Sequence, residues 1–407
     1  MMKKNRKLYL TALFGLAVFC FWGYVRPEVI LARESFQLFL YQDDYLMERL
    51  AFPGGMARYV GEFLVQFFRF VTLGALLSAI LLVAIQQLFG VLLKRVLPAV
   101  SEKILFSVSF LPSVVLCYLL CDLDFSMTLP VGLLFTLVLI LLLPHRKMPA
   151  FIVSCLLVPI GYWLAGPIIV LLPLYHLRML SIPRERIAVV AQTSGMGLLL
   201  LACIISSSYF VPYSLENIFK GLDYQMIQRG KYGTDEEMVY DRLLRMKDWN
   251  EIVRRSNEQE PQSLACKNVV RLAKYYLKQI SGDELKENLL HTYEVLTSGM
   301  AAMMMSDVYL HMGFPNISQR AAFEVLESTS NYNMSGRELS RLVETALITG
   351  QYEVALKYIS LLESTLFYRN WAKQMRELAA HPETIKRVPF YGPLQDIYGQ
   401  TVDVNFF

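Results

Sequence analysis

The chain has 407 residues, of which 55% are hydrophobic and 18% charged, with a formal net charge of +4. This hydrophobic content is too high for an ordinary soluble protein. The charge is also divided, because residues 1–209 carry 17 Lys and Arg against 10 Asp and Glu, whereas residues 210–407 carry 22 against 25. The small net charge is therefore no sign of a nucleic-acid-binding protein; it predicts a basic membrane half followed by a slightly acidic soluble half.

The first apolar run directly follows a basic N-terminus. Residues 8–25 come after four Lys and Arg residues within the first seven positions, which is also how a signal peptide begins. The run ends in bulky side chains, including Phe19, Phe21 and Trp22, where a signal peptidase requires small ones. We therefore expect a retained anchor with its N-terminus in the cytoplasm.

Residues 26–61 form the first outer loop in this topology. The loop contains apolar residues at 30–31, 36 and 38–40, followed by the breaker Pro53-Gly54-Gly55. Aromatic residues then recur at helical spacing, at Tyr59, Phe63, Phe67 and Phe70. This pattern predicts two amphipathic helices that lie in the membrane interface.

Three further apolar runs, at residues 70–93, 104–121 and 128–143, are each near the length of a membrane-crossing helix. Residues 149–177 cross either once or twice, with a turn near Gly166-Pro167 in the second case. A double crossing puts the basic residues that follow on the cytoplasmic side, together with the other basic loops. The positive-inside preference therefore favours the double crossing. These basic residues are Arg178, Arg184 and Arg186.

Residues 187–209 are the last apolar run. With the double crossing, the bundle spans residues 1–209 and has about seven spans in an inner (plasma) membrane. The C-terminal half then lies outside the cytoplasm, in the periplasm of a cell with two membranes. A single crossing gives six spans and a cytoplasmic C-terminal half, and this alternative stays open.

Residues 210–390 are predicted to form a soluble domain of paired helices. Two apolar stripes at helical spacing flank Gly350, which suits the end of a helix; they are Leu339, Leu342, Val343, Ala346 and Leu347, then Tyr352, Ala355, Ile359, Leu362 and Leu366. Gly313 and the turn at Lys247-Asp248-Trp249 place similar pairs upstream at intervals close to 34 residues. The sequence therefore predicts an all-α protein with a tetratricopeptide-like α-solenoid, and an irregular tail at residues 391–407.

Both ends of the chain resemble one known family. The N-terminal resemblance lies in Phe36-Gln37-Leu38-Phe39, Asp44-Tyr45 and Phe52-Pro53-Gly54-Gly55, and the C-terminal one in Tyr352-Glu353-Val354-Ala355, Lys357-Tyr358 and residues 365–372. These stretches are similar to a family of bacterial multi-pass proteins known as domain of unknown function 6057. The resemblance implies an inner-membrane bundle with a helical-repeat domain, and it implies no established activity.

Two acidic pairs in the outer loops are the candidate catalytic residues. Asp43 and Asp44 lie in the first outer loop, and Asp122 and Asp124 lie in the second. The plan resembles that of multi-spanning glycosyltransferases that use polyprenyl-phosphate-linked sugars. A carboxylate there can accept the proton of an acceptor hydroxyl, and paired carboxylates can hold a divalent cation against a phosphate leaving group. The alternative is that acidic residues are tolerated in outer loops because the basic ones stay inside.

No cofactor or metal site is predicted. The five histidines form no His-x-x-x-His or Glu-x-x-His pair, and Cys266 is the single cysteine of the soluble half. The methionines at positions 300 and 303–305 have the spacing of a helix core. No phosphate-binding loop, dinucleotide fingerprint or nucleic-acid-binding face is present in the sequence.

Two functional hypotheses follow. The first is an envelope scaffold, held in the lipid bilayer, whose helical repeats bind a protein or peptide partner outside the membrane. The second is a glycosyltransferase-like enzyme that uses the outer-loop aspartates.

Overall fold

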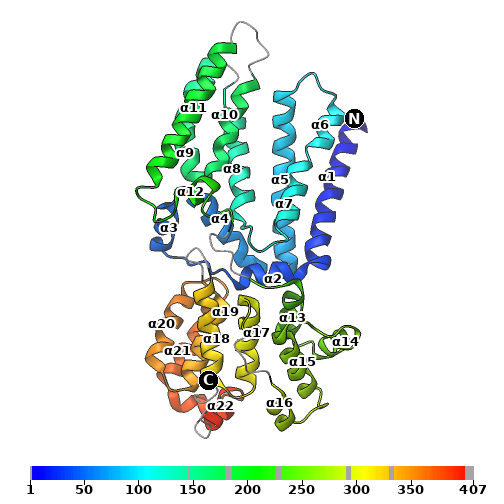
Figure 1. Cartoon of the computed structure of the whole chain (residues 1–407), viewed down its shortest axis with the longest axis vertical. Coiled ribbons are helices and arrows are strands. Elements are labelled where there is room, and N and C mark those ends of the chain that lie inside the picture. Colours follow the sequence, from blue (N-terminus) through cyan, green and yellow to red (C-terminus); the bar gives the residue numbers. More distant parts are fainter. Residues whose placement is uncertain are drawn as a thin grey trace. The chain divides into compact units, whose positions relative to one another are not determined.

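A computed structural model of the chain (Figure 1) describes residues 2–144, 147–178, 186–225, 232–289, 295–329 and 334–398. Within these ranges the chain is helical and contains no β-strand. It forms two compact units. The N-terminal unit comprises Met1–Ile30 and Asp43–Ile227, and the C-terminal unit comprises Leu31–Gln42 and Gln228–Phe407.

This division differs from the expected boundary after residue 209 in two places. Residues 210–225 pack with the N-terminal unit, and Leu31–Gln42, from the expected outer loop, pack with the C-terminal helices. Sequence patterns report which residues are apolar. They do not report which distant segment covers them.

The N-terminal unit is built from apolar helices that run side by side, with α1, α5, α8, α9 and α11 in succession (Figure 1). Shorter helices α3, α4 and α12 lie at the end of this bundle away from the N-terminus. The helices are α1 (Met2–Cys20), continued by η1 (Phe21–Val25), α2 (Pro27–Ser35), α3 (Asp43–Leu50), α4 (Gly55–Val65), η2 (Gln66–Arg69), α5 (Val71–Val96), α6 (Glu102–Val108), α7 (Leu111–Leu119), α8 (Thr128–Leu142), α9 (Lys147–Ala165), η3 (Pro167–Val170), α10 (Leu171–His176), α11 (Arg186–Ser207) and α12 (Leu215–Lys220). The residues of α2 from Leu31 onward belong to the C-terminal unit.

Among the described residues, five helical stretches are long and apolar enough to cross a membrane, which is consistent with the expected membrane protein. They are Arg6–Val25, Val71–Val96, Glu102–Leu119, Met148–Ala165 and Arg186–Ser207. Two shorter apolar helices are Thr128–Leu142 and Pro167–His176. The expected count of seven spans stays a prediction. Arg184, one of the basic residues that favour the double crossing, lies outside the described residues.

The ambiguous segment 149–177 doubles back on itself. The rings of Phe151 and His176 have centroids 6.0 Å apart, whereas a straight helix would separate these positions by roughly 37 Å. Gly161 faces Ile169 so closely that a Cβ on the glycine would lie 2.5 Å from Ile169 Cδ1. The reversal occurs at Gly166, whose φ of 82° lies in the region that favours glycine.

The C-terminal unit consists mainly of successive helix pairs. The first helix of each pair begins at Asp235, Leu264, Gly299, Gly336 or Arg369, so the pairs recur at roughly even intervals. Gly313 and Gly350 have φ of 83° and 78° between paired helices, which confirms their predicted role as helix stops. The elements are α13 (Asp235–Met246), α14 (Trp249–Glu258), α15 (Leu264–Tyr276), α16 (Gly282–Asn288), α17 (Gly299–His311), α18 (Pro315–Ser328), α19 (Gly336–Ile348), α20 (Tyr352–Glu363), α21 (Arg369–Ala380), η7 (Pro382–Arg387) and α22 (Tyr391–Tyr398).

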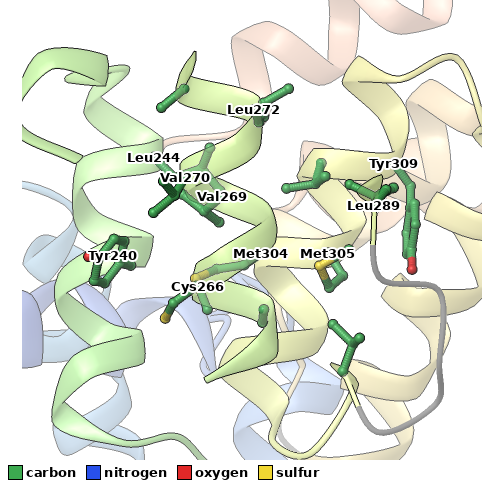
Figure 2. Close-up of a cluster of buried hydrophobic side chains, with 14 of the residues drawn as sticks. Tyr240, Leu244, Cys266, Val269, Val270, Leu272, Leu289, Met304, Met305 and Tyr309 are labelled. Carbon is green, nitrogen blue, oxygen red and sulfur yellow. The ribbon is translucent and has the colours of Figure 1, made fainter. Parts of the chain in front are cut away.

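The core of this unit includes the predicted methionine cluster. Helix α17 is buried on nearly every side, and its methionines at 300 and 303–305 are 0% exposed, which confirms them as core. Figure 2 shows side chains of α13, α15 and α17 converging around Cys266 and Met304. Because Cys266 is fully buried, burial raises the pKa of its thiol far above the ordinary value.

Two predictions about the end of the chain need correction. Leu366 was assigned to a buried stripe but is 45% exposed, because α20 ends at Glu363 before the stripe reaches it. Residues 391–398 form α22 and are not irregular, since Tyr391 and Leu394 are buried against the unit. The remainder of the predicted tail, residues 399–407, lies outside the described residues.

Candidate functional site

A buried charge cluster lies where the first loop meets the bundle of the N-terminal unit. Glu62 of α4 accepts hydrogen bonds from Tyr45 (2.5 Å), Arg49 (2.8 Å) and Arg58 (2.7 Å). Arg58 also pairs with Asp223, with 3.1 Å between Nη1 and Oδ1. The Arg49 guanidinium lies 4.1 Å from the centre of the Tyr45 ring. All five side chains are buried, so their charges must be balanced by one another.

A sharp turn brings α3 and α4 together to form this cluster. Gly54 has a φ of 81°, and its N–H points at the carbonyl oxygens of Tyr162 and Trp163 near the end of α9. The Trp163 indole N–H donates to the Leu50 carbonyl over 3.0 Å. Gly54 and Gly166 approach so closely that a Cβ on Gly54 would lie 3.3 Å from the Gly166 Cα. The Pro-Gly-Gly breaker thus fixes the loop to the α9 turn.

Asp223 is held in place by its neighbours. The hydroxyl of Ser126 donates to the Asp223 carbonyl, and the Ser126 N–H donates to the Tyr224 carbonyl over 3.1 Å. The Tyr224 hydroxyl in turn donates to the Ala165 carbonyl and accepts from the Ile168 N–H, at 3.2 Å, across the Gly166 reversal. One segment therefore anchors both the charge cluster and the hairpin turn.

The two carboxylates differ in electrostatic character. Burial alone would raise the pKa of the Glu62 carboxyl, but Arg58 and Arg49 together hold it below its usual value. Burial raises the pKa of Asp223, and Arg58 opposes this only in part. Within the described residues, Oδ2 of Asp223 has no hydrogen-bond partner. Glu62 is thus a saturated structural anion, whereas Asp223 keeps one free acceptor oxygen.

The predicted aspartates do not form this cluster. Asp43 and Asp44 lie in the first turn of α3 and are exposed, directly before Tyr45. The carboxylate of Asp122 accepts the backbone N–H of Asp124 over 3.0 Å in a turn that leads to Ser126. Across the described parts of the chain, no group of three or more His, Cys, Asp or Glu side chains has the arrangement of a metal site.

A comparison with protein-family models places this sequence in a family. The model described as "Family of unknown function (DUF6057)" matches residues 2–407. The chain belongs to this family. Comparisons with curated proteins and with solved structures found no match.

The C-terminal unit of this DUF6057 protein holds a second charge network. Arg337 Nη1 lies 2.7 Å from Asp241 Oδ1, and the Asp307 carboxylate is shared by Arg337 and Arg341. Burial alone would raise the pKa of Asp307, but the two guanidinium groups hold it well below its usual value. The network ties α13, α17 and α19 together.

An aromatic row lies on the same unit, formed by Trp249, Tyr275, Tyr276, His311 and Phe390. Trp249 and Tyr276 stack with centroids 4.7 Å apart and nearly parallel rings. His311 lies edge-on to both Tyr276 (5.6 Å) and Phe390 (5.4 Å). Tyr275, Tyr276 and Phe390 are each more than one-third exposed. The row therefore presents aromatic side chains from several helix pairs.

Part of this geometry has a sequence signal. Arg58 and Glu62 stand at i and i+4 on the predicted interfacial helix, a spacing that puts both on one face. The amphipathic interpretation assigned that face to water and lipid headgroups. The sequence pattern did not reveal Asp223, which follows the last apolar helix. It also did not reveal the aromatic row, whose members are spread over several helix pairs.

Proposed function

We propose that this protein is a multi-pass membrane scaffold that presents its C-terminal unit to a protein or peptide partner outside the cytoplasm. One observation carries the proposal: Leu31–Gln42, which follow the first apolar helix, belong to the same compact unit as Gln228–Phe407. A single folded unit has to lie on one side of the membrane. The loop after α1 and the C-terminal unit then share that side.

This arrangement requires an even number of crossings between residues 42 and 228. Six apolar helical stretches lie in the described parts of that interval, namely α5, the α6–α7 run, α8, α9, η3–α10 and α11. With α1 they make seven spans. The proximity of Phe151 and His176 supports counting α9 and η3–α10 separately, although the short second leg requires a thinned bilayer or shielding by neighbouring helices.

The positive-inside preference supports the choice of side. Lys94 and Arg95 lie in the last turn of α5 and Lys103 in the first turn of α6. All three flank the turn between these helices, which is on the same side as the basic N-terminus in the seven-span arrangement. The C-terminal unit then faces the periplasm or the cell exterior.

The partner-binding role rests on the helix pairs and on the aromatic row. Helix pairs at roughly even intervals support a tetratricopeptide-like solenoid, an architecture whose extended surfaces serve as binding faces. Tyr, Trp and Phe are enriched at protein interfaces because they supply large contact areas with few rotatable bonds. The row formed by Trp249, Tyr275, Tyr276, His311 and Phe390 is the proposed contact surface.

Single-cysteine reporters test the side. The six native cysteines are replaced, and intact cells are treated with a membrane-impermeant maleimide. Met47→Cys in the first loop and Lys357→Cys in the C-terminal unit should react, because both positions are exposed. Ala99→Cys, exposed between α5 and α6, should react only after permeabilisation. If the cysteine at position 357 is labelled only after permeabilisation, like the one at position 99 and unlike the one at position 47, the proposal is contradicted. Cys266 itself is unsuitable as a reporter because it is buried.

A photo-crosslinking amino acid at position 275 tests the binding role. We expect a discrete crosslinked partner in cells, which is lost when Tyr276→Ala and Phe390→Ala are added in the same chain. A crosslinker at Met246, which is 60% exposed but outside the row, serves as the matched control. Equal yields at both positions, or no effect of the two substitutions, would count against the aromatic row as the contact surface.

A glycosyltransferase-like enzyme is the second candidate, on the observation that Asp43 and Asp44 are exposed at the start of α3, the helix that carries Tyr45 and Arg49 of the charge cluster. A carboxylate at such a position could accept the proton of an acceptor hydroxyl. The test is complementation of a deletion strain by Asp44→Ala and Asp122→Ala separately. Full restoration of any surface-glycan defect by both variants would exclude this function.

A further inference from the structure

An extended segment of the first loop is built into the C-terminal unit. Residues 37–42 have neither helical nor strand structure, and Phe36 lies in a turn directly before them. We call residues 36–42 the strap. Phe36, Leu38, Phe39 and Leu40 are each at most 6% exposed. An extended segment with this degree of burial requires a groove that accepts side chains along its length.

Two glycines at equivalent positions form the floor of that groove. Gly299 begins α17 and Gly336 begins α19, each directly after a serine that caps the helix. A Cβ on Gly299 would lie 2.8 Å from Phe36 Cε1, and a Cβ on Gly336 would lie 2.9 Å from Leu38 Cδ1. The absence of these Cβ atoms is what leaves room for the strap.

The spacing of the strap matches the spacing of the helix pairs. Phe36 and Leu38 are two residues apart, so their Cα atoms are separated by at most about 7 Å even where the chain is fully extended. Packed helices are about 8–10 Å apart, and these two side chains meet the starts of the first helices of successive pairs. The strap therefore crosses the repeats, one side chain to each pair.

Polar contacts hold both ends of the strap. Downstream, the Tyr41 N–H donates to the Ser364 carbonyl over 2.8 Å, and the Gln42 amide donates to the Ser364 hydroxyl over 2.7 Å. Upstream, the Glu34 carboxylate accepts from the Tyr368 hydroxyl at 3.1 Å and from Arg245 at 3.3 Å. A backbone hydrogen bond, a charge and alternating apolar anchors are the elements by which grooves recognise extended peptides.

We propose that the strap is an intramolecular peptide ligand, and that the C-terminal unit has a groove for an extended apolar polypeptide that the chain fills with its own residues. An external peptide of the same pattern enters only when the strap leaves. The inference goes beyond the proposed scaffold role, and it holds on whichever side of the membrane the unit lies.

A disulfide tests whether the strap is docked. Gln42→Cys and Ser364→Cys are introduced into the full chain without native cysteines, and the protein purified in detergent is oxidised. We expect cross-linking, because the Gln42 amide contacts the Ser364 hydroxyl and the hydrogen bond from the Tyr41 N–H to the Ser364 carbonyl brings the two backbones together. Gln42→Cys with Lys357→Cys, about two helical turns earlier on α20, should not cross-link. Absence of the first disulfide would overturn the proposal. Its formation in detergent does not depend on membrane side, so this result is separable from the reporter experiment.

Peptide binding tests whether the groove is a ligand site. The probe is a fluorescent peptide with the sequence of residues 34–43. We expect the reduced Gln42→Cys/Ser364→Cys protein to bind it at least about tenfold more tightly than the oxidised protein, in which the strap is locked. The full-chain variant Leu38→Asp/Phe39→Asp should bind it more tightly still.

A control peptide carrying Asp at the positions of Leu38 and Phe39 should not bind. If circular dichroism shows that the Leu38→Asp/Phe39→Asp variant is unfolded, the comparison of the reduced and oxidised proteins decides alone. Equal binding by those two forms would overturn the proposal.

Discussion

Arg58 and Asp223, far apart in the sequence, form an ion pair of 3.1 Å in the interior of the N-terminal unit. The same guanidinium holds Glu62 at 2.7 Å, so one arginine joins α4 to the segment after α12. Both partners are buried. Removing one member of such a cluster leaves an uncompensated charge away from water, which is costlier than losing the contact itself.

Glu62→Gln should destabilise the protein by about 3–5 kcal/mol, because it leaves Arg49 and Arg58 with too little negative charge in a buried site. The measurement is denaturant unfolding of the purified protein in detergent. Asp44→Asn on the exposed start of α3 is the control, and it should cost less than about 1 kcal/mol. Similar losses for both variants would mean that the cluster is not a stabilising element.

Gly166→Ala should destabilise the N-terminal unit by about 1–3 kcal/mol, because Gly166 has a φ of 82° and a ψ of −162°, a conformation that other residues rarely adopt. A Cβ there would also lie 2.8 Å from the Tyr224 hydroxyl. Gly195→Ala and Gly197→Ala in α11 are matched controls, since nothing lies within 4 Å of either Cβ position. Thermal unfolding of the three variants checks the prediction; an unchanged Gly166→Ala protein would contradict it.

The buried Glu338 should make the stability of the C-terminal unit fall as pH rises. Burial raises the pKa of its carboxyl to about 7. The negative charge of Asp307 adds to this rise, whereas the positive charges of Arg337 and Arg341 oppose it. A raised pKa in the folded state means that the stabilisation is present below the ordinary value of 4.5 and is lost as pH rises through 7. The loss is on the order of 2–3 kcal/mol.

Glu338→Gln should abolish this loss, because the amide stays neutral. Unfolding measured at pH 5 and at pH 8 checks it: the variant should gain stability relative to the parent only at the higher pH. A gain of equal size at both values would point to packing and not to titration.

His311 should act in the opposite direction. Burial lowers the pKa of its imidazole to about 4, Asp307 opposes this, and Arg341 and Lys247 add to it. The stability that depends on neutral His311 is present above its ordinary value of 6.5 and is lost as pH falls through 4. Between about pH 4.5 and 6.5 the two groups partly cancel. We therefore expect the Glu338→Gln protein to lose stability as pH falls through this window, because only His311 then titrates there. Adding His311→Asn should remove that loss. A stability that stays constant with pH in the Glu338→Gln/His311→Asn protein would confirm the assignment.

Much of the architecture follows from local patterns. The apolar runs at residues 70–93 and 187–209 correspond closely to α5 and α11, and the spacing of Leu339, Leu342 and Leu347 correctly predicted a buried face of α19. Gly313 and Gly350 were recognised as helix stops because the left-handed conformation strongly favours glycine there. Such features depend on a few neighbouring residues, so one sequence suffices to find them.

The candidate sites could not be predicted from such local patterns. Asp43, Asp44, Asp122 and Asp124 were singled out as acidic residues in loops. The buried cluster uses Glu62 and Asp223 instead, because the turn at Gly54 and the hydrogen bonds of Tyr224 bring together segments that are distant in the sequence. No periodicity connects Arg58 with Asp223, or Asp241 with Arg337.

The sequence by itself determined that this protein is helical, where its apolar runs lie, and where several of its helix pairs turn, since periodicity and glycine placement act over one or two helical turns. Only the tertiary structure decided that residues 31–42 leave the first loop to complete the C-terminal unit. The physical reason is that Phe36 and Leu38 are apolar in any context. Their place is chosen by the room that Gly299 and Gly336 leave beside them, and that complementarity exists only once both helices are packed.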